Sequence, residues 1–162
     1  MVQISVENLA DVREKHGEDT LVIAHGVFDI LHPGHLDHLE TAKSLGNVVA
    51  VAIWSNEHVA SRKGPERPYI DIKDRLRMVD GFSTVSYVFE VPDPEYTEGM
   101  MDPIVAAAEP DYYLLPDWDP MFGGAPFRGH DSGRTTSFVY DVSYLRKASS
   151  TTEIVNRIKN GA

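Results

Sequence analysis

The stretch Gly-Val-Phe-Asp-Ile-Leu-His-Pro-Gly-His, residues 26–35, decides the fold of this chain. An apolar run at residues 21–24 precedes it and predicts a buried strand. The apolar residues that follow have helical spacing: Leu36, Leu39, Ala42 and Leu45. The stretch therefore lies where a strand passes into a helix N-terminus, which presents unpaired N–H groups and a partial positive charge suited to a phosphate. His32 and His35 are three residues apart and share one face of the first turn.

These histidines have three interpretations. A histidine at a helix start is commonly a surface or capping residue. His32, His35 and His38 could also bind a metal ion, but no acid-rich or cysteine-bearing segment completes such a site. The whole string Gly-x-Phe-Asp-x-x-His-x-Gly-His resembles the signature of the cytidylyltransferase-like nucleotidyltransferases. That string is far more specific than a lone glycine loop, and it favours the third interpretation.

The length and composition indicate one globular domain. A chain of 162 residues can bury a substantial core, and we expect a single nucleotidyltransferase domain over residues 1–162. Cysteine is absent, which excludes disulfides and thiol chemistry. The sequence does not begin with a basic region followed by an apolar stretch, and no apolar run approaches ~20 residues. We therefore expect a cytoplasmic protein without a signal peptide or a membrane span.

The charge is acidic overall but unevenly distributed. Fifteen Lys and Arg against 25 Asp and Glu give a net charge of −10, which disfavours nucleic acids and anionic membranes as partners. Six of the 15 positive charges lie within 16 residues: Arg62, Lys63, Arg67, Lys73, Arg75 and Arg77. This basic segment predicts a local site for a small anion; the alternative is a solvated basic face.

Strand and helix patterns alternate along the chain. Strands are expected at residues 20–24, 48–54, 85–91, 112–115 and 138–144. Residues 2–17 are expected to form a short strand and an amphipathic helix, or a loosely packed arm. Helices are expected at residues 33–45, 71–79, 96–109 and 150–159, and a long loop at residues 116–134. Asp71 is the expected N-cap of the second helix, and a capping box that begins at Ser150 opens the last one. This alternation predicts an α/β fold, an open parallel sheet of about five strands with helices on both faces. Ligands bind such sheets at the carboxyl ends of the strands. The histidine motif, Trp54, the long loop and the Ser-Thr-Thr cap all follow strands, so we expect them to meet at one edge of the sheet. The resemblance implies the same Rossmann-like fold.

The resemblance runs from about residue 21 to residue 158 and includes three further segments. Residues 62–68 and 74–79 resemble the family's basic loop and the arginine-bearing helix after it. Residues 111–118 resemble a strand that ends in an Asp-Trp or Asp-Tyr pair, and residues 150–154 resemble the Ser-Thr-Thr-x-Ile motif of the final helix. Their order and spacing identify the chain as a member of the family.

The resemblance implies transfer of a nucleoside monophosphate from a nucleoside triphosphate to a small phosphorylated alcohol or sugar. An acceptor phosphate oxygen attacks the α-phosphorus and pyrophosphate leaves, so the protein must supply positioning and cationic or dipolar donors. His32 and His35 would donate to the triphosphate, Lys63 would bridge the acceptor and the α-phosphate, and Arg75 would hold either substrate. Asp29 is expected to orient the turn. Mg²⁺ is expected with the triphosphate, without a metal site built from the protein's own residues.

The expected nucleotide-binding residues come from the histidine motif and from the second half of the chain: Gly26, Val27, Phe28, Asp117, Trp118, Arg146, Ser150, Thr151 and Thr152. By resemblance, Asp117 and Trp118 would line the base and ribose pocket. Ser150 and Thr151 would bind the β- and γ-phosphates through hydroxyl and backbone N–H groups.

Three features depart from the family pattern. Pro116 stands where the family often has glycine, and the spacing between Arg146 and Ser150 is one residue shorter than in related cytidylyltransferases. The insertion at residues 119–134 has no assigned counterpart, and the Gly-Arg-Thr-Thr piece at its end is expected to contact the acceptor or a neighbouring subunit.

The nucleotide and the acceptor stay open. The Asp-Trp pair and Arg146 favour a cytidylyltransferase similar to those for glycerol 3-phosphate or ethanolamine phosphate, which we place first. The Lys-Gly and Arg-Pro pairs of the basic segment favour an adenylyltransferase similar to those acting on heptose 1-phosphate, and the histidine motif also resembles flavin adenylyltransferases acting on FMN. A non-catalytic nucleotide-binding module is the alternative of another class. Homodimers are common in the family, and nucleic acid and membrane are not expected as partners.

Overall fold

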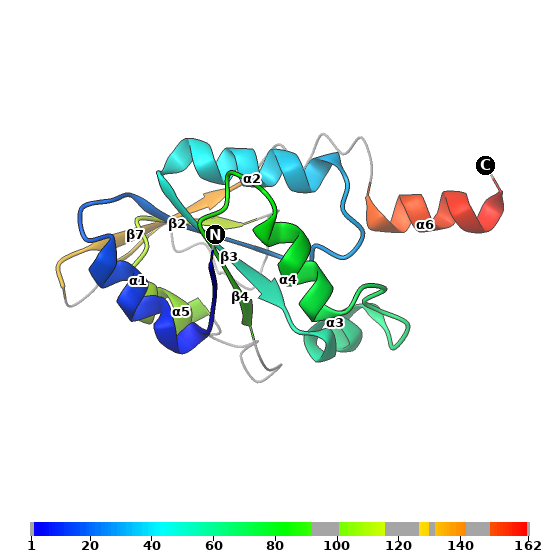
Figure 1. Cartoon of the computed structure of the whole chain (residues 1–162), viewed down its shortest axis with the longest axis horizontal. Coiled ribbons are helices and arrows are strands. Elements are labelled where there is room, and N and C mark those ends of the chain that lie inside the picture. The colour runs from blue at the N-terminus through cyan, green and yellow to red at the C-terminus, as the bar shows by residue number, and fades with distance from the viewer. Residues whose placement is uncertain (1, 92–100, 116–126, 130–131, 142–149, 162) are drawn as a thin grey trace.

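The computed structural model describes residues 2–91, 101–115, 127–129, 132–141 and 150–161 (Figure 1). Its described strands form one sheet: β1 (Val2–Ile4), β2 (Leu21–Gly26), β3 (Val48–Trp54), β4 (Tyr87–Val91), β5 (Tyr112–Leu115), β6 (Phe127–Gly129) and β7 (Thr135–Tyr140). The strand order is β1-β4-β3-β2-β5-β7-β6. All neighbouring strands are parallel except β6, which pairs antiparallel with β7. The predicted Rossmann-like parallel sheet is therefore confirmed.

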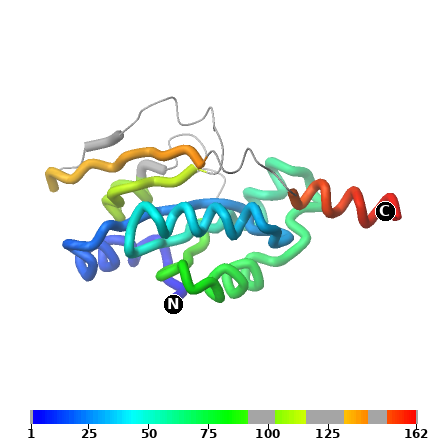
Figure 2. Tube along the Cα trace, turned by 90° about the horizontal axis from the view of Figure 1, so that it is seen from above, coloured from blue at the N-terminus to red at the C-terminus, as the bar shows by residue number. Residues whose placement is uncertain are grey.

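Helices cover both faces of this sheet. The described helices are α1 (Leu9–Lys15, after a 3-10 turn at Val6–Asn8), α2 (Pro33–Leu45), α3 (Asn56–Lys63), α4 (Ile72–Asp80), α5 (Met101–Ala108) and α6 (Thr151–Asn160). Helices α1 and α5 pack against one face, and α2 and α4 against the other (Figure 1). Helix α6 extends from the body at the C-terminal end in both views (Figures 1 and 2). None of the described helices is both long and apolar enough to cross a membrane.

Two hydrophobic cores lie on the two faces because side chains alternate along each strand. On the α1/α5 face, Ile23 of β2 packs in one cluster with Leu9 and Ile104. On the other face, Val22 packs with Leu39 of α2 and with residues of α4. Burial on both faces explains why β2 and β3 are almost continuously apolar.

Some predicted elements have different bounds in the structure. Helix α2 spans residues 33–45 as predicted, and Asp71 caps α4 by accepting a hydrogen bond from the Lys73 N–H at 3.0 Å. Helix α3 was not predicted and includes only the first two residues, 62 and 63, of the expected basic loop; its short, polar sequence gives little apolar periodicity. Strand β6 lies inside the expected long loop, and three residues are too few to show a period. Strand β7 begins three residues before the predicted 138–144, of which residues 142–144 lie outside the described residues.

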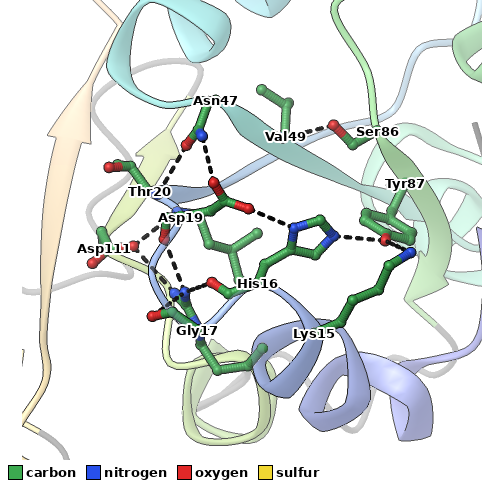
Figure 3. Close-up of polar contacts among 12 residues, drawn as sticks. Lys15, His16, Gly17, Asp19, Thr20, Asn47, Val49, Ser86, Tyr87 and Asp111 are labelled. Carbon is green, nitrogen blue, oxygen red and sulfur yellow. Dashed lines mark hydrogen bonds and ion pairs between the residues drawn. The ribbon is translucent and has the colours of Figure 1, made fainter.

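A polar network closes the amino-terminal edge of the sheet (Figure 3). His16 uses both ring nitrogens: Nδ1 lies 2.8 Å from Asp19 Oδ2, and Nε2 lies 2.9 Å from the Tyr87 hydroxyl. The other Asp19 oxygen accepts a hydrogen bond from the Asn47 amide at 2.6 Å, and Lys15 donates to the Tyr87 hydroxyl at 3.1 Å. These contacts join the end of α1 to the starts of β2, β3 and β4.

Asp111 anchors the same edge just before β5. Its Oδ2 accepts hydrogen bonds from the Leu21 N–H at 2.8 Å and from Arg13 at 3.2 Å. Arg134, from the Gly-Arg-Thr-Thr piece, donates to the Gly17 carbonyl and lies 3.7 Å from Asp111 Oδ1. The first residues of a parallel strand lie at the edge opposite the histidine motif, which disfavours the expected contact of this piece with the acceptor. Its contact with a neighbouring subunit stays a prediction.

Candidate active site

The histidine motif begins α2 at the carboxyl end of β2. His32 is the extended residue before the helix (φ −148°, ψ 166°), and its carbonyl accepts a hydrogen bond from the His35 N–H at 2.9 Å. Pro33 occupies the first turn, where its missing N–H leaves no bond unmade. The two imidazole rings stack with their centroids 3.9 Å apart. A β-carbon on Gly34 would lie 3.1 Å from the His32 ring, so glycine leaves room for this stack.

Phe28 packs against the His35 ring of this stack. It is fully buried with a left-handed backbone (φ 51°), which is uncommon for a bulky residue, and its ring lies 5.0 Å from that of His35. A β-carbon on Gly26 would lie 2.8 Å from the Phe28 ring, so glycine is required there. Gly26 and Phe28 were expected to bind nucleotide; in the structure they set the position of His35.

His35 is only 6% exposed, and burial lowers its pKa to about 3. The charges of His32, His38 and Lys63 contribute to this lowering, and the Asp29 carboxylate opposes it. The His35 ring is therefore neutral near pH 7 and carries one N–H donor and one acceptor. Its Nδ1 is buried and has no hydrogen-bond partner among the described residues. An unpaired buried polar atom of this kind is available to a ligand.

Asp29 fixes the basic segment against the histidine motif, as the expected orienting role requires. Its buried carboxylate accepts hydrogen bonds from Arg67 Nε and from the N–H groups of Tyr69 and Ile70, each at 2.9 Å. Arg67 Nη2 completes an ion pair at 2.7 Å. The position of the chain after Lys63 therefore depends on one carboxylate.

Arg75 lies inside the protein rather than at its surface. Its guanidinium donates hydrogen bonds at 2.8–2.9 Å to the carbonyls of Ile70, Val27 and Trp54 and to Asn56 Oδ1. Four donors are thus engaged by protein, and the side chain is fully buried. This geometry gives Arg75 a positioning role, whereas the sequence led us to expect contact with a phosphate. The Val27 carbonyl is one of the groups that it holds.

Lys63 ends α3, and its charge acts on His35, so α3 brings a cation close to the histidine stack. Thr151 Oγ1 donates to the Ile30 carbonyl at 3.3 Å, which brings the start of α6 to the motif from 121 residues away in sequence. Ser150 caps α6 by accepting a hydrogen bond from the Glu153 N–H at 3.2 Å, and Thr152 is exposed in the first turn. The starts of α2 and α6 therefore lie together at the carboxyl end of β2. The predicted residues Asp117, Trp118 and Arg146 lie outside the described residues.

Sequence reasoning missed a buried pair behind the motif. His38 Nδ1 lies 2.8 Å from Asp141 Oδ2, and both side chains are almost fully buried. The Asp141 N–H donates to the Leu115 carbonyl at 2.8 Å, so the pair joins α2 to β5 and to the end of β7. Residues 103 positions apart give no local signal in a single sequence. In the described part of the chain, no group of three metal-ligating side chains is arranged to hold a metal ion.

A second missed cluster contains His25, Trp54, His58 and Tyr113. The His58 and Trp54 rings stack with centroids 4.1 Å apart, and the His25 ring lies 5.5 Å from that of Trp54 and 5.6 Å from that of Tyr113. Burial lowers the pKa of His25 to about 3, and the charges of His38 and His58 act in the same direction. Trp54 was expected at this edge because it follows a strand, but its ring contacts with His25 and His58 were not predicted.

Comparison with known proteins agrees with this geometry. The cytidylyltransferase-like family matches residues 23–157, which is most of the chain. The chain belongs to this family. Among curated relatives, the bifunctional protein HldE of Actinobacillus succinogenes is 33% identical over 69% of this chain, and that of Pseudomonas syringae pv. syringae is 32% identical over 88%. The chain spans 24% and 28% of the length of these two relatives.

Two solved structures share the fold of this chain. The lipopolysaccharide core biosynthesis protein of Thermoplasma volcanium is 30% identical, with a TM-score of 0.51 over 60% of this chain and 74% of that one. The pantoate-beta-alanine ligase of Francisella tularensis has a TM-score of 0.60 over 98% of this chain and 77% of that one. At 13% identity, the ligase shows the shared fold alone. The predicted nucleotidyltransferase-type fold is thus confirmed.

Proposed function

We propose that this domain transfers a nucleoside monophosphate from a nucleoside triphosphate to a sugar phosphate. An acceptor phosphate oxygen forms the new bond to the α-phosphorus, the bond from that phosphorus to the bridging oxygen breaks, and pyrophosphate leaves with the electron pair. The observation that carries the proposal is the His32–His35 stack at the start of α2, whose His35 ring is neutral near pH 7, with the charge of Lys63 acting on it.

This stack suits a reaction whose nucleophile is already an anion. A histidine with a pKa of about 3 is unprotonated near pH 7 before substrate binds, so it is a poor general acid there. As a neutral ring, His35 would donate one hydrogen bond to the charge that develops on the phosphate oxygens. The first-turn N–H groups of α2 and the Lys63 ammonium would add to that stabilisation. Mg²⁺ would arrive bound to the triphosphate and neutralise part of its charge.

The sugar phosphate is proposed as acceptor because one similar structure is named for biosynthesis of the lipopolysaccharide core, and polysaccharides are assembled from activated sugars. Two nucleotides have support. CTP is favoured by the Asp117-Trp118 pair and by Arg146. ATP is favoured by the Lys-Gly and Arg-Pro pairs of the basic segment, whose Arg67 is held by Asp29.

Pyrophosphate release tests the proposal. CTP, ATP, GTP and UTP are each combined with Mg²⁺ and one of five acceptors: heptose 1-phosphate, glycerol 3-phosphate, ethanolamine phosphate, ribitol 5-phosphate or FMN. We expect release that requires one triphosphate together with an acceptor and that is fastest with a sugar phosphate. Triphosphate binding by calorimetry without release for any pair would instead support a non-catalytic module.

A further inference from the structure

The His25–Trp54–His58 cluster lies at the same edge of the sheet as the histidine motif but on the other face. Ile23 and Tyr113 point into the core beneath α1 and α5, and alternation along β2 places His25 on that face too. Trp54 ends β3, and His58 lies in the first turn of α3, which begins two residues later. A ligand over the strand ends could therefore touch both His35 and this cluster.

His58 carries an unused polar atom in this cluster. The residue is 5% exposed, and its Nδ1 is buried with no hydrogen-bond partner among the described residues. Burial lowers the pKa of His58, and the charge of Arg62 acts in the same direction. The ring is therefore neutral near pH 7. A buried polar atom without a partner is destabilising unless something else supplies the bond, and a substrate group can do so.

The chemistry of the cluster fits the ring of a sugar. A neutral imidazole has one donor and one acceptor, which matches a hydroxyl group better than an anion. The half-buried indole of Trp54 offers an apolar surface for the C–H groups of a ring, as aromatic side chains do in small-molecule sites.

The phosphate of the same substrate has a cation within reach. Lys63 lies five residues after His58 on α3, about 7.5 Å along the helix axis at 1.5 Å per residue. The charge of Lys63 acts on His35, so its end of α3 faces the histidine motif. His58 and Lys63 do not share a face of α3, but a molecule over the strand ends could place its hydroxyls near His58 and its phosphate near the end of α3 at Lys63.

We propose that the Trp54–His58 stack is the subsite for the hydroxyl-bearing ring of the acceptor, and that it selects sugar phosphates over acyclic alcohol phosphates. The inference rests on the proposed nucleotidyl transfer, whose acceptor it describes more closely. His58 Nδ1 forms a hydrogen bond with a hydroxyl of the sugar ring, and the Trp54 indole packs against that sugar ring.

The test compares two acceptors in His58→Phe, which keeps a ring on Trp54 and removes the polar atom. We expect the KM for heptose 1-phosphate to rise about tenfold, the effect of one lost hydrogen bond, with the KM for the triphosphate unchanged. Turnover of glycerol 3-phosphate, which has no ring, should change little, so the preference for the sugar falls by the same factor. His58→Asn restores a polar atom near the Nδ1 position and should recover part of the loss.

His16→Phe is the matched control, since His16 also packs on an aromatic ring, 5.7 Å from that of Tyr87, at the far edge of the sheet. It should leave the acceptor preference unchanged. Equal losses with both acceptors in His58→Phe, or wild-type turnover with acyclic acceptors alone, would overturn the subsite while nucleotidyl transfer stands. If the wild type releases no pyrophosphate at all, the proposed function fails. Calorimetry with heptose 1-phosphate then decides the subsite: binding about tenfold weaker in His58→Phe supports it, and absent or equal binding overturns it.

Discussion

The two edges of the sheet use histidine in opposite ways. At the amino-terminal edge, both ring nitrogens of His16 have partners, Asp19 and the Tyr87 hydroxyl (Figure 3). At the carboxyl-terminal edge, His35 and His58 each bury an Nδ1 atom that has no hydrogen-bond partner among the described residues. Unpaired buried polar atoms destabilise a fold, so their presence at the edge where ligands bind parallel sheets indicates function. The amino-terminal edge, in contrast, contributes stability.

Asp29→Asn should have the largest effect on the carboxyl-terminal edge. The carboxylate is buried, accepts three hydrogen bonds and pairs with Arg67, so removing its charge leaves a buried guanidinium uncompensated. We expect the free energy of unfolding to fall by about 3 kcal/mol. Turnover should fall at least tenfold as well, because the segment after Lys63 loses its anchor. Urea denaturation and pyrophosphate release measure the two effects.

Asp71→Asn is the control for this change. Asp71 also accepts hydrogen bonds from N–H groups, but at the exposed cap of α4, where asparagine is an equally good cap. Its free energy of unfolding should change by no more than about 0.5 kcal/mol. Similar losses in the two variants would contradict the special role of Asp29.

Acid should destabilise the protein through the histidines of the carboxyl-terminal edge. The pKa values of His25 and His35 are about 3 in the folded chain and 6.5 ordinarily, so between these values the unfolded chain binds protons that the folded chain does not. Their contribution to stability is fully present above pH 6.5 and is lost as the pH falls toward 3. At pH 5 the loss is about 2 kcal/mol for each histidine.

His25→Phe isolates one of these two contributions. Urea denaturation at pH 7.5 and pH 5 should show a smaller loss for His25→Phe than for the wild type, by about 2 kcal/mol. An equal pH dependence in His25→Phe and the wild type would show that His25 titrates normally in the folded protein.

Asp111→Asn should have the smallest effect, and only on stability. The carboxylate holds the start of β2 and Arg13, but its side chain is 32% exposed, so solvent screens the ion pair. We expect a loss of about 1 kcal/mol in the free energy of unfolding, with kcat and both KM values unchanged. A loss of turnover would mean that the amino-terminal edge also contributes to the reaction.

Much of the difference between the two edges of the sheet could be predicted from the sequence. The strand–histidine–helix pattern at residues 21–45 located both the parallel sheet and the edge that carries His35, because those signals are local. The partners of Asp29 and Arg75 could not be predicted, since burial of a charged side chain depends on segments up to 48 residues away. The same limit explains why Arg75 was assigned to a phosphate: a basic residue in a sequence has the same appearance whether its donors face solvent or backbone carbonyls.

The aromatic cluster was missed for a different reason. Trp54 and His58 are close in sequence, but a helix was not predicted between Asn56 and Lys63, so no face could be assigned to His58. His38 and Asp141 were missed because their contact crosses most of the chain. Helix caps such as Asp71 and Ser150 depend on two or three neighbouring residues and were predicted correctly.

The most direct test of the division between the two edges is one pair of variants, His35→Ala and His16→Ala, each measured for turnover and for stability. For His35→Ala we predict a fall in kcat of about a hundredfold or more, with triphosphate affinity by calorimetry within a few-fold of the wild type. For His16→Ala we predict a loss of about 1 kcal/mol in the free energy of unfolding, with kcat unchanged. Equal losses of kcat and affinity in His35→Ala, or a fall in kcat in His16→Ala, would contradict the account.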